Sequence, residues 1–118
     1  MFELNGQTAI VTGAATGIGE AIARRLAAAG ATIAVADLNL AEATHVAGSL
    51  NNRSFAVECD VSRRDSVERA IESVLAKTAQ IDILVNNAGI AGRAAPIWEQ
   101  TEEDWNRTIA INLTGVFH

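Results

Sequence analysis

The sequence predicts an α/β fold, a doubly wound parallel sheet with helices on both of its faces. Short apolar runs alternate along the chain with longer segments of helical period, which is typical of consecutive βαβ units. The runs are almost continuously apolar, as in strands that are covered on both sides. A glycine-rich segment also joins the first run to the first helical segment, where such folds make a tight turn.

Four apolar runs are the predicted strands, and each is followed by a polar residue or a glycine. The strands span residues 8–11, 32–36, 54–57 and 81–85. The residues that follow them are Thr12 with Gly13, Asp37, Asp60, and Asn86. Because the carboxyl ends of parallel strands lie at one edge of the sheet, we expect these residues to meet there, where open α/β sheets bind ligands.

The segments between the strands carry apolar residues at the i, i+3, i+4 spacing of a buried helix face. In the first helix this face comprises Ile18, Ala21, Ile22, Leu26 and Ala29, and Gly30 is the expected stop signal. In the third helix it comprises Val67, Ala70, Ile71, Val74 and Leu75.

Capping residues mark the start of two further helices. Asn39 precedes the second helix, with Glu42 three positions later. Thr101 precedes the last helix, and Asp104 makes the weaker, aspartate form of the same capping box. The inward face of this last helix is Trp105, Ile109, Asn112 and Val116. Because Val116 and Phe117 continue that face without a stop signal, we expect His118 to be a cut rather than a natural terminus.

The composition indicates one soluble domain and excludes several classes of function. The 118 residues are 49% hydrophobic, and 9 basic against 14 acidic residues give a net charge of −5. The basic residues do not cluster, which argues against a nucleic-acid partner, and no apolar run is long enough to cross a membrane. One cysteine, Cys59, and two histidines far apart exclude an internal disulfide and argue against a metal site. We expect a cytoplasmic protein.

The most specific feature is the segment Thr12-Gly13-Ala14-Ala15-Thr16-Gly17-Ile18-Gly19 between a strand and a helix. Gly13 suits the chain reversal, Gly17 lets the backbone approach a pyrophosphate, and Gly19 permits close packing of helix on strand. The helix N-terminus supplies N–H donors and a partial positive charge. No Lys-Ser or Lys-Thr follows, which disfavours a phosphate-hydrolysing loop. The simpler interpretation is a turn that serves chain reversal alone.

Asp37 ends the second strand, 20 positions after Gly17, which is the spacing of an acid that binds the adenosine ribose. Its carboxylate would accept hydrogen bonds from ribose hydroxyls and repel a 2′-phosphate, and neither Thr16 nor Leu38 supplies a compensating cation. The sequence therefore predicts NAD as cofactor and disfavours NADP. The alternative is a solvated acid at a strand end.

Three other positions are candidates for the same site, each with a structural alternative. Asp60 and Val61 follow the third strand, although Asp60 could merely start a turn before Ser62 caps the next helix. Asn86-Asn87-Ala88-Gly89 follows the fourth strand and lets the backbone pass close to a ligand. Asn112 projects with the apolar face of the last helix, where a buried amide needs hydrogen-bond partners whether its role is structural or catalytic.

In this order, these motifs resemble the N-terminal half of a short-chain dehydrogenase/reductase, and the resemblance covers all 118 residues. It implies a Rossmann-type, three-layer α/β/α domain, truncated here, with strand order 3-2-1-4. Residues 1–118 would then be part of an NAD(P)-binding domain whose catalytic half is absent.

The resemblance also implies a role for each motif. Gly13, Thr16, Gly17 and Ile18 would surround the adenosine and pyrophosphate, with Gly19 structural. Asp37 would hold the ribose, with Leu38 beside the adenine and Asp60 and Val61 at the adenine edge. Asn87, Ala88, Gly89, Ile90 and Ile111 would line the second ribose, with Asn86 structural. Asn112 matches the catalytic asparagine of the family, whose backbone helps to hold a water in a proton relay.

The family's catalytic serine and its Tyr-x-x-x-Lys motif have no counterpart here, since the chain has no tyrosine and Lys77 is its only lysine. We therefore expect a fragment of an NAD-dependent oxidoreductase that acts on a small alcohol or carbonyl and that is inactive alone. A non-catalytic adenine-dinucleotide-binding or association module stays open as an alternative. Without a fifth strand, the apolar fourth strand would form an exposed edge, which predicts a homo-oligomer.

Overall fold

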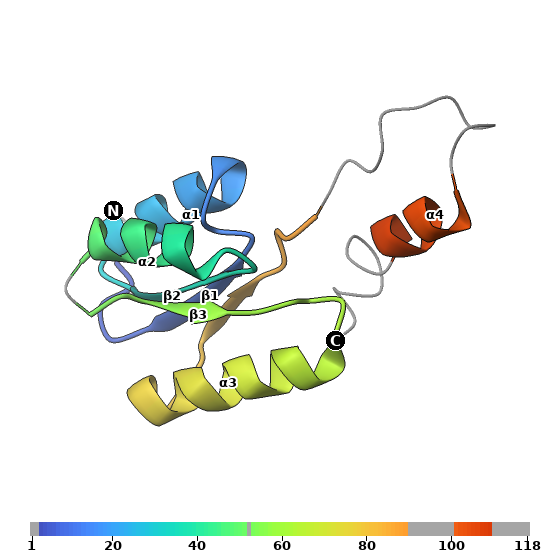
Figure 1. The fold of residues 1–118 in the computed structure, drawn as a ribbon. Helices are drawn as coiled ribbons and strands as arrows, with labels where there is room; N and C mark the ends of the chain where they lie inside the picture. Colours follow the sequence, from blue (N-terminus) through green and yellow to red (C-terminus); the bar gives the residue numbers. More distant parts are fainter. Residues whose placement is uncertain (1–2, 52, 90–100, 110–118) are drawn as a thin grey trace.

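A four-stranded parallel sheet in the order β3-β2-β1-β4 forms the centre of the fold (Figure 1). The computed structural model describes residues 3–51, 53–89 and 101–109. The strands are β1 (Thr8–Thr12), β2 (Thr32–Asp37), β3 (Phe55–Glu58) and β4 (Ile83–Val85). The predicted fold class and strand order are confirmed.

The fourth strand is shorter than predicted because Asp82 pairs with β1 through its side chain as well as its backbone. The Thr8 amide donates to Asp82 Oδ2 at 2.9 Å, and the Asp82 amide donates to the Thr8 carbonyl at 2.9 Å. The Asp82 carboxylate thus accepts the hydrogen bond of the Thr8 amide in place of a backbone carbonyl of the neighbouring strand. The regular ladder of β4 begins only with Ile83, which lies opposite Ala9.

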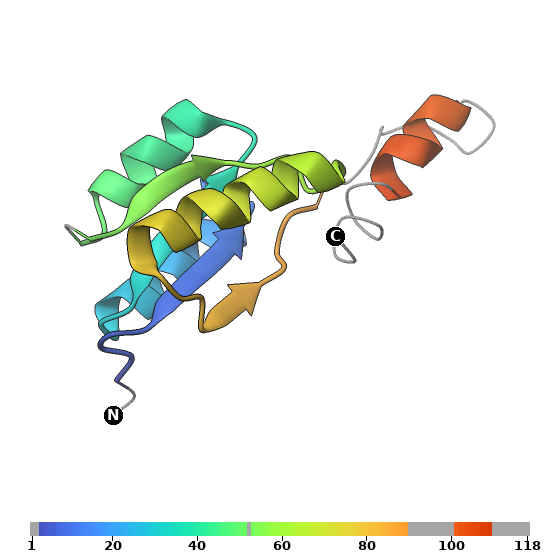
Figure 2. The same ribbon diagram turned by 90° about the horizontal axis from the view of Figure 1, so that it is seen from below.

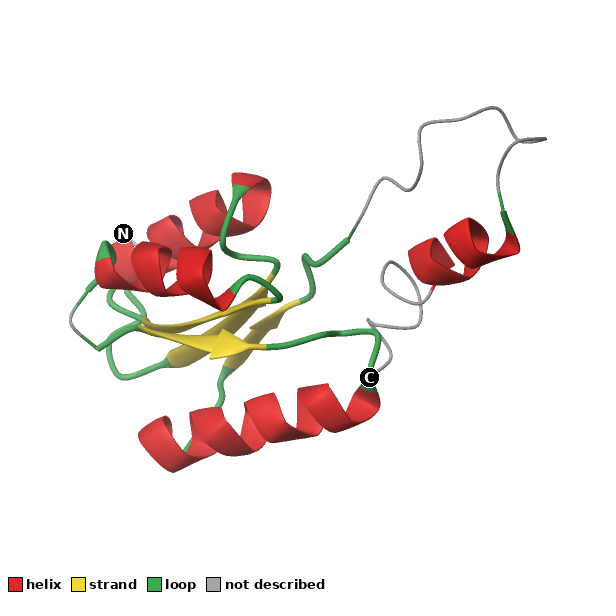
Figure 3. Cartoon of the chain, viewed as in Figure 1, coloured by secondary structure: helices red, strands yellow, loops and turns green. Residues whose placement is uncertain are grey.

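The helices cover the sheet on both faces (Figures 1 and 3). The covering helices are α1 (Gly17–Ala28), α2 (Leu40–Gly48) and α3 (Arg64–Thr78), and a fourth helix, α4 (Glu102–Ile109), lies away from the sheet. Helices α1 and α2 lie on one face, and α3 lies on the other. Figure 2 shows β4 at one edge of the sheet. No helix within the three described ranges is long and apolar enough to cross a lipid bilayer.

Alternation along the strands divides the core between the two faces. Val11, Ile33 and Val35 belong to the cluster that packs under α1 and α2, together with Ala23, Ala43 and Val46 from those helices. Ile10 and Ala34 point the other way and pack with Ala70 and Val74 of α3. Both faces of β1 and β2 are therefore apolar, which explains why these runs lack the polar alternation of a half-exposed strand.

The predicted capping residues are confirmed. Asn39 Oδ1 accepts a hydrogen bond from the Glu42 amide at 3.1 Å at the start of α2. Thr101 and Asp104 bond reciprocally, with the Asp104 amide donating to Thr101 Oγ1 at 2.9 Å and the Thr101 amide donating to Asp104 Oδ2 at 3.1 Å. At Gly30, after α1, φ is +104°. The chain thus follows its local signals at these helix ends.

Replacing Ile33 with alanine tests the central core. The Ile33 side chain is fully buried in β2, so Ile33→Ala removes apolar contacts and leaves a cavity. We expect a loss of about 2–5 kcal/mol in the free energy of unfolding, measured by urea denaturation. Leu38 is 57% exposed just beyond the same strand, and Leu38→Ala should change stability by no more than about 0.5 kcal/mol. Equal losses in the two variants would contradict this assignment of the core.

Candidate functional site

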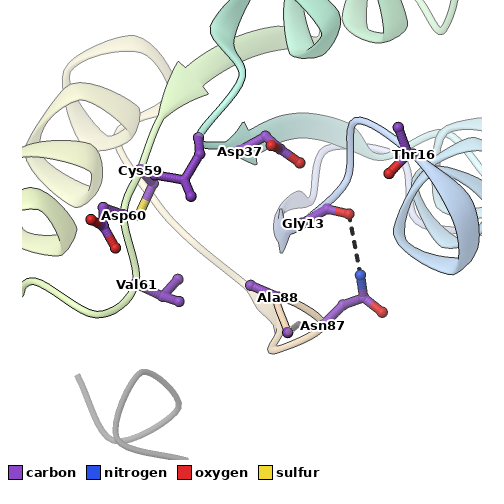
Figure 4. Close-up of a pocket in the computed structure, with 10 residues that line it drawn as sticks. Gly13, Thr16, Asp37, Cys59, Asp60, Val61, Asn87 and Ala88 are labelled. Atoms are coloured by element: carbon purple, nitrogen blue, oxygen red, sulfur yellow. Dashed lines mark hydrogen bonds between the residues drawn. The ribbon is translucent and has the colours of Figure 1, made fainter. Parts of the chain in front are cut away.

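The carboxyl ends of the strands surround a cavity of about 320 Å³ (Figure 4). Segments from four turns meet at it, one after each strand. The residues that line it are Gly13, Thr16, Asp37, Leu38, Cys59, Asp60, Val61, Asn87, Ala88 and Gly89. The topology thus brings together segments that are more than 70 positions apart in the sequence.

The glycine-rich turn after β1 forms one side of this cavity. Gly13 and Gly17 have φ angles of +65° and +61°, a left-handed conformation that favours glycine. A positive φ at Gly13 agrees with the predicted chain reversal, whereas the positive φ at Gly17 is an additional reason for glycine there. Thr16 is the N-cap of α1, and its side chain makes no capping hydrogen bond. The first N–H groups of α1 therefore keep capacity for an acceptor from outside the helix.

Gly19 is the point of closest approach between α1 and the strand ends. A Cβ at this position would collide with the Gly13 carbonyl oxygen and with Asn87 Nδ2. A Cβ at Gly13 would in turn come within 2.9 Å of the Ala88 Cα. The absence of side chains at these two glycines therefore allows the turns after β1 and β4 to pack closely against the start of α1. Close packing of helix on strand is what the sequence predicted for Gly19.

Thr12 joins the ends of β1 and β4 through its hydroxyl group. Its Oγ1 donates to the Val85 carbonyl at 3.3 Å and accepts from the amides of Asn87 and Ala88, both at 3.0 Å. The side chain is buried, so these bonds form away from solvent. This role of Thr12 was not predicted from the sequence. The signal for it was a hydroxyl side chain at the end of the first strand, directly before the first glycine.

Asn87 supplies a second tie between the same turns. Its Nδ2 donates to the Gly13 carbonyl at 3.2 Å (Figure 4). Asn87 therefore has a structural contact of the kind that the resemblance implied for Asn86, in addition to lining the cavity. Asn86 itself is exposed and lines an apolar groove of about 240 Å³ between the sheet and α3.

Asp37 projects from the end of β2 with both carboxylate oxygens bonded to backbone amides. Oδ2 accepts from Ala15 at 3.1 Å, and Oδ1 accepts from Asn39 at 3.0 Å. An ionised carboxylate offers about four acceptor positions, so two remain for a ligand. The first of these contacts, between Asp37 and the glycine-rich turn, was not predicted from the sequence.

The segment after β3 contributes Cys59, Asp60 and Val61. Asp60 Oδ1 accepts from the Ser62 amide at 3.0 Å and from its hydroxyl, while the Asp60 amide donates to Ser66 Oγ at 2.9 Å. In the structural alternative for Asp60, this residue starts a turn and Ser62 caps the next helix. The turn is present, since the Arg63 amide also donates to the Asp60 carbonyl at 3.1 Å, but Ser62 is not the cap. Its hydroxyl bonds to Asp60, and Arg63 is the N-cap of α3 without a side-chain capping bond.

Cys59 is an additional lining residue that was not among the site residues predicted from the sequence. Burial raises the pKa of the Cys59 thiol, and the neighbouring Asp60 charge raises it further. The thiol is therefore predominantly protonated near neutral pH, which makes it a poor nucleophile. Cys59 and Val61 also line the apolar groove beside α3, so this short segment separates the two cavities.

The predicted site residues fall into three groups. Nine of them line the cavity: Gly13, Thr16, Asp37, Leu38, Asp60, Val61, Asn87, Ala88 and Gly89. Gly17, Ile18 and Gly19 form the first turn of α1 beside it, where Ile18 is 74% exposed and Gly19 is buried. Ile90, Ile111 and Asn112 lie outside the described residues.

The cavity offers hydrogen-bond donors and acceptors from different elements. Its charged lining residues are Asp37 and Asp60, with no lysine or arginine among the residues that line it in the described part of the chain. The helix start offers donors and the two acids offer acceptors. Within the ranges that the structure covers, no group of histidine, cysteine and acidic side chains could hold a metal ion.

Comparison with known proteins gives close relatives along the whole chain. A D-threitol dehydrogenase from Mycolicibacterium smegmatis is 49% identical over 121 residues, covering 98% of this chain and 45% of the relative. A sorbitol dehydrogenase from Cereibacter sphaeroides is 41% identical over 112 residues, covering 95% of this chain and 43% of the relative. The chain thus spans less than half the length of these relatives.

The fold is also similar to solved structures. A 3-ketoacyl-(acyl-carrier-protein) reductase from Brucella melitensis, solved as a complex with NADH, superposes with a TM-score of 0.91 at 37% identity. The match covers 96% of this chain and 47% of that one. A family model described as short chain dehydrogenase matches residues 7–118.

Two glycine-to-alanine variants test the close approach at the site. Gly19→Ala introduces a methyl group against the Gly13 carbonyl and Asn87, so we expect it to destabilise the fold by about 1–3 kcal/mol. Gly48→Ala is the matched control, because a Cβ there meets nothing within 4 Å and the helix ends at that residue. It should be neutral or stabilising by up to about 1 kcal/mol. Urea denaturation of both variants measures the difference, and equal stabilities would refute the packing role of Gly19.

Proposed function

This chain belongs to the short-chain dehydrogenase family, and on that premise we propose that its cavity binds the adenosine and diphosphate part of NAD. One observation carries the proposal. The glycine-rich turn, the start of α1 and the Asp37 carboxylate all border one cavity at the carboxyl edge of the sheet. Donors for a diphosphate and acceptors for a ribose thus stand side by side.

The diphosphate would bind at the N-terminus of α1. The N–H groups of Gly17 and Ile18 belong to the first turn, and no Thr16 side-chain cap competes for those donors. The Cβ position of Gly17 faces open space, which leaves room for a phosphate close to the backbone. The amide groups and the helix dipole would both stabilise the negative charge.

The adenosine would occupy the part of the cavity between the ends of β2 and β3. The two remaining acceptor positions of Asp37 match the two hydroxyl groups of the adenosine ribose in number. Leu38 would contact the adenine face, and Asp60 and Val61 its edge. Asn87, Ala88 and Gly89 would line the path toward the second ribose, together with Ile90 and Ile111.

We propose NAD rather than NADP as the cofactor because of the charge at this point. A 2′-phosphate on the adenosine ribose would lie against the Asp37 carboxylate. No basic side chain lines the cavity within the described ranges to offset the repulsion. Asp60 adds a second negative charge to the same lining.

The complete protein would transfer a hydride between NAD and a secondary alcohol or carbonyl group of a small molecule. NAD supplies or accepts that hydride, while the protein binds and orients the reactants. Asn112 would be the catalytic asparagine that helps to hold a water. Because these 118 residues contain no tyrosine to act as general acid or base, we propose that they bind cofactor but do not turn over substrate alone.

Calorimetry with ADP-ribose, NADH and NADPH tests cofactor binding. We expect ADP-ribose and NADH to bind and NADPH to bind at least about tenfold more weakly, since repulsion of about 1.4 kcal/mol gives that factor. Flat titrations for ADP-ribose, NADH and AMP alike would refute the site. Reduction of a carbonyl compound by the purified chain would refute the proposed inactivity.

Gly17→Ala and Gly6→Ala form a matched pair for this test. Both glycines have positive φ and open space at the Cβ position, so both variants carry a similar backbone strain. Only Gly17 borders the proposed diphosphate. Weaker ADP-ribose binding should therefore appear in Gly17→Ala and not in Gly6→Ala.

Self-association would use the free edge of β4. This strand pairs with β1 on one side, and no other strand in the described part of the chain pairs with it. Leu84 on this strand is 58% exposed, and Ile71 and Leu75 on α3 are also exposed. We propose that a second copy of the chain covers this apolar edge.

Light scattering over a concentration series measures this association. We expect an average mass above that of the monomer, and a reduced mass for Leu84→Lys because a charge on the edge opposes strand pairing. Ala41→Lys, on the exposed surface of α2, adds the same charge away from the edge and should leave the mass unchanged. A monomer at high concentration would contradict the proposal.

A further inference from the structure

The carboxylate of Asp37 is already engaged by the protein on both of its oxygens. The Ala15 amide donates to Oδ2 at 3.1 Å, and the Asn39 amide donates to Oδ1 at 3.0 Å. Ala15 belongs to the glycine-rich turn after β1, and Asn39 is the N-cap of α2. One side chain therefore holds two segments that come from different βα units.

The contact to Ala15 extends the pairing of β1 and β2 into the turn. The Ala14 amide donates to the Ala36 carbonyl at 3.3 Å, and the next amide, that of Ala15, donates to Asp37. The side chains of Ala14 and Ala15 are buried. Both amides thus donate to β2, and the Asp37 carboxylate continues the contact of β2 with the turn one residue beyond the Ala36 carbonyl.

We propose that Asp37 is a positioning residue for the phosphate-binding turn, in addition to its role as ribose acceptor. The proposal rests on the proposed function, since it concerns the same ligand. The Asp37–Ala15 hydrogen bond would set where the chain leaves β1 and hence where Thr16 and Gly17 present the start of α1. A hydrogen bond from a partly buried amide to a charged acceptor is among the stronger ones in proteins, so this bond can hold the turn in place.

This assignment couples the choice of cofactor to the binding of phosphate. A substitution of Asp37 by a residue without a side-chain acceptor removes both the repulsion of a 2′-phosphate and the acceptor of the Ala15 amide. Such a variant would tolerate NADP better but would bind the diphosphate that both cofactors share more weakly. Exchange of cofactor preference would therefore need a residue that keeps a neutral acceptor for Ala15.

If Asp37 acted on phosphate binding only through its charge, its loss would change the affinity in the direction opposite to the one we propose. The charge effect and the positioning effect can therefore be separated. Asp37 brings a negative charge to a site for an anion, and its removal should strengthen the binding of inorganic pyrophosphate. A weaker binding of pyrophosphate after the loss of this charge would require a change in the turn. Pyrophosphate carries no ribose, so the ribose contacts of Asp37 do not contribute.

The experiment compares Asp37→Ala with Asp37→Asn, which remove the same charge. Asparagine keeps one carbonyl oxygen, which should turn to Ala15 because the Asn39 amide is exposed and can bond to water instead. In NMR titrations with inorganic pyrophosphate, we expect Asp37→Ala to bind about tenfold more weakly than Asp37→Asn. Asp37→Val gives the same comparison should the alanine variant not fold. Equal affinities of the charge-matched variants would overturn the proposal.

A measurement without ligand separates this proposal from the proposed function. Hydrogen exchange of the Ala15 amide should be about tenfold faster in Asp37→Ala than in the unchanged chain. Glu58→Gln is the control, because Glu58 lies opposite Asp37 at the exposed end of β3 and its loss removes a charge without touching the turn. Unchanged exchange at Ala15 in Asp37→Ala would overturn the positioning role. Failure of the unchanged chain to bind ADP-ribose would instead refute the cofactor site.

Discussion

The close approach of α1 to the ends of β1 and β4 is the constraint on which the cavity depends. At Gly19 the helix lies so near the Gly13 carbonyl and Asn87 that no Cβ fits between them. This contact places the start of the helix at the strand ends, where its N-cap residue Thr16 lines the cavity. The hydrogen bonds of Thr12 and Asn87 hold the opposite side of the same junction. A wider junction would separate the donors of α1 from the turn after β4.

Local signals in the sequence were sufficient to locate the four strands and the two capped helix starts. The apolar runs gave the strands because both faces of β1 and β2 are buried, and the order 3-2-1-4 followed from the family resemblance. Asn39 and Thr101 marked helix starts because a cap acts on amides two or three residues away. Strand ends were less predictable. The side chain of Asp82 shortens β4 through a bond to Thr8, a residue 74 positions away.

Most of the residues around the cavity could be predicted from the sequence, but the hydrogen bonds between them could not. The turns after the strands were expected to meet, and the parallel topology brings them to one cavity. What the sequence could not reveal is which polar groups bond to each other. Thr12, Asn87 and Asp37 each bond to backbone atoms of a different segment, and such pairs follow only from the register of the strands. Asp37 therefore carries a structural contact that its spacing from Gly17 did not indicate.

Cys59 and Val61 border both the polar cavity at the strand ends and the apolar groove beside α3. The two cavities therefore share these two residues as a common wall. A larger side chain at position 59 would take volume from both cavities at once. The size of this residue is thus constrained from two sides, and neither cavity can be reshaped there without a change in the other.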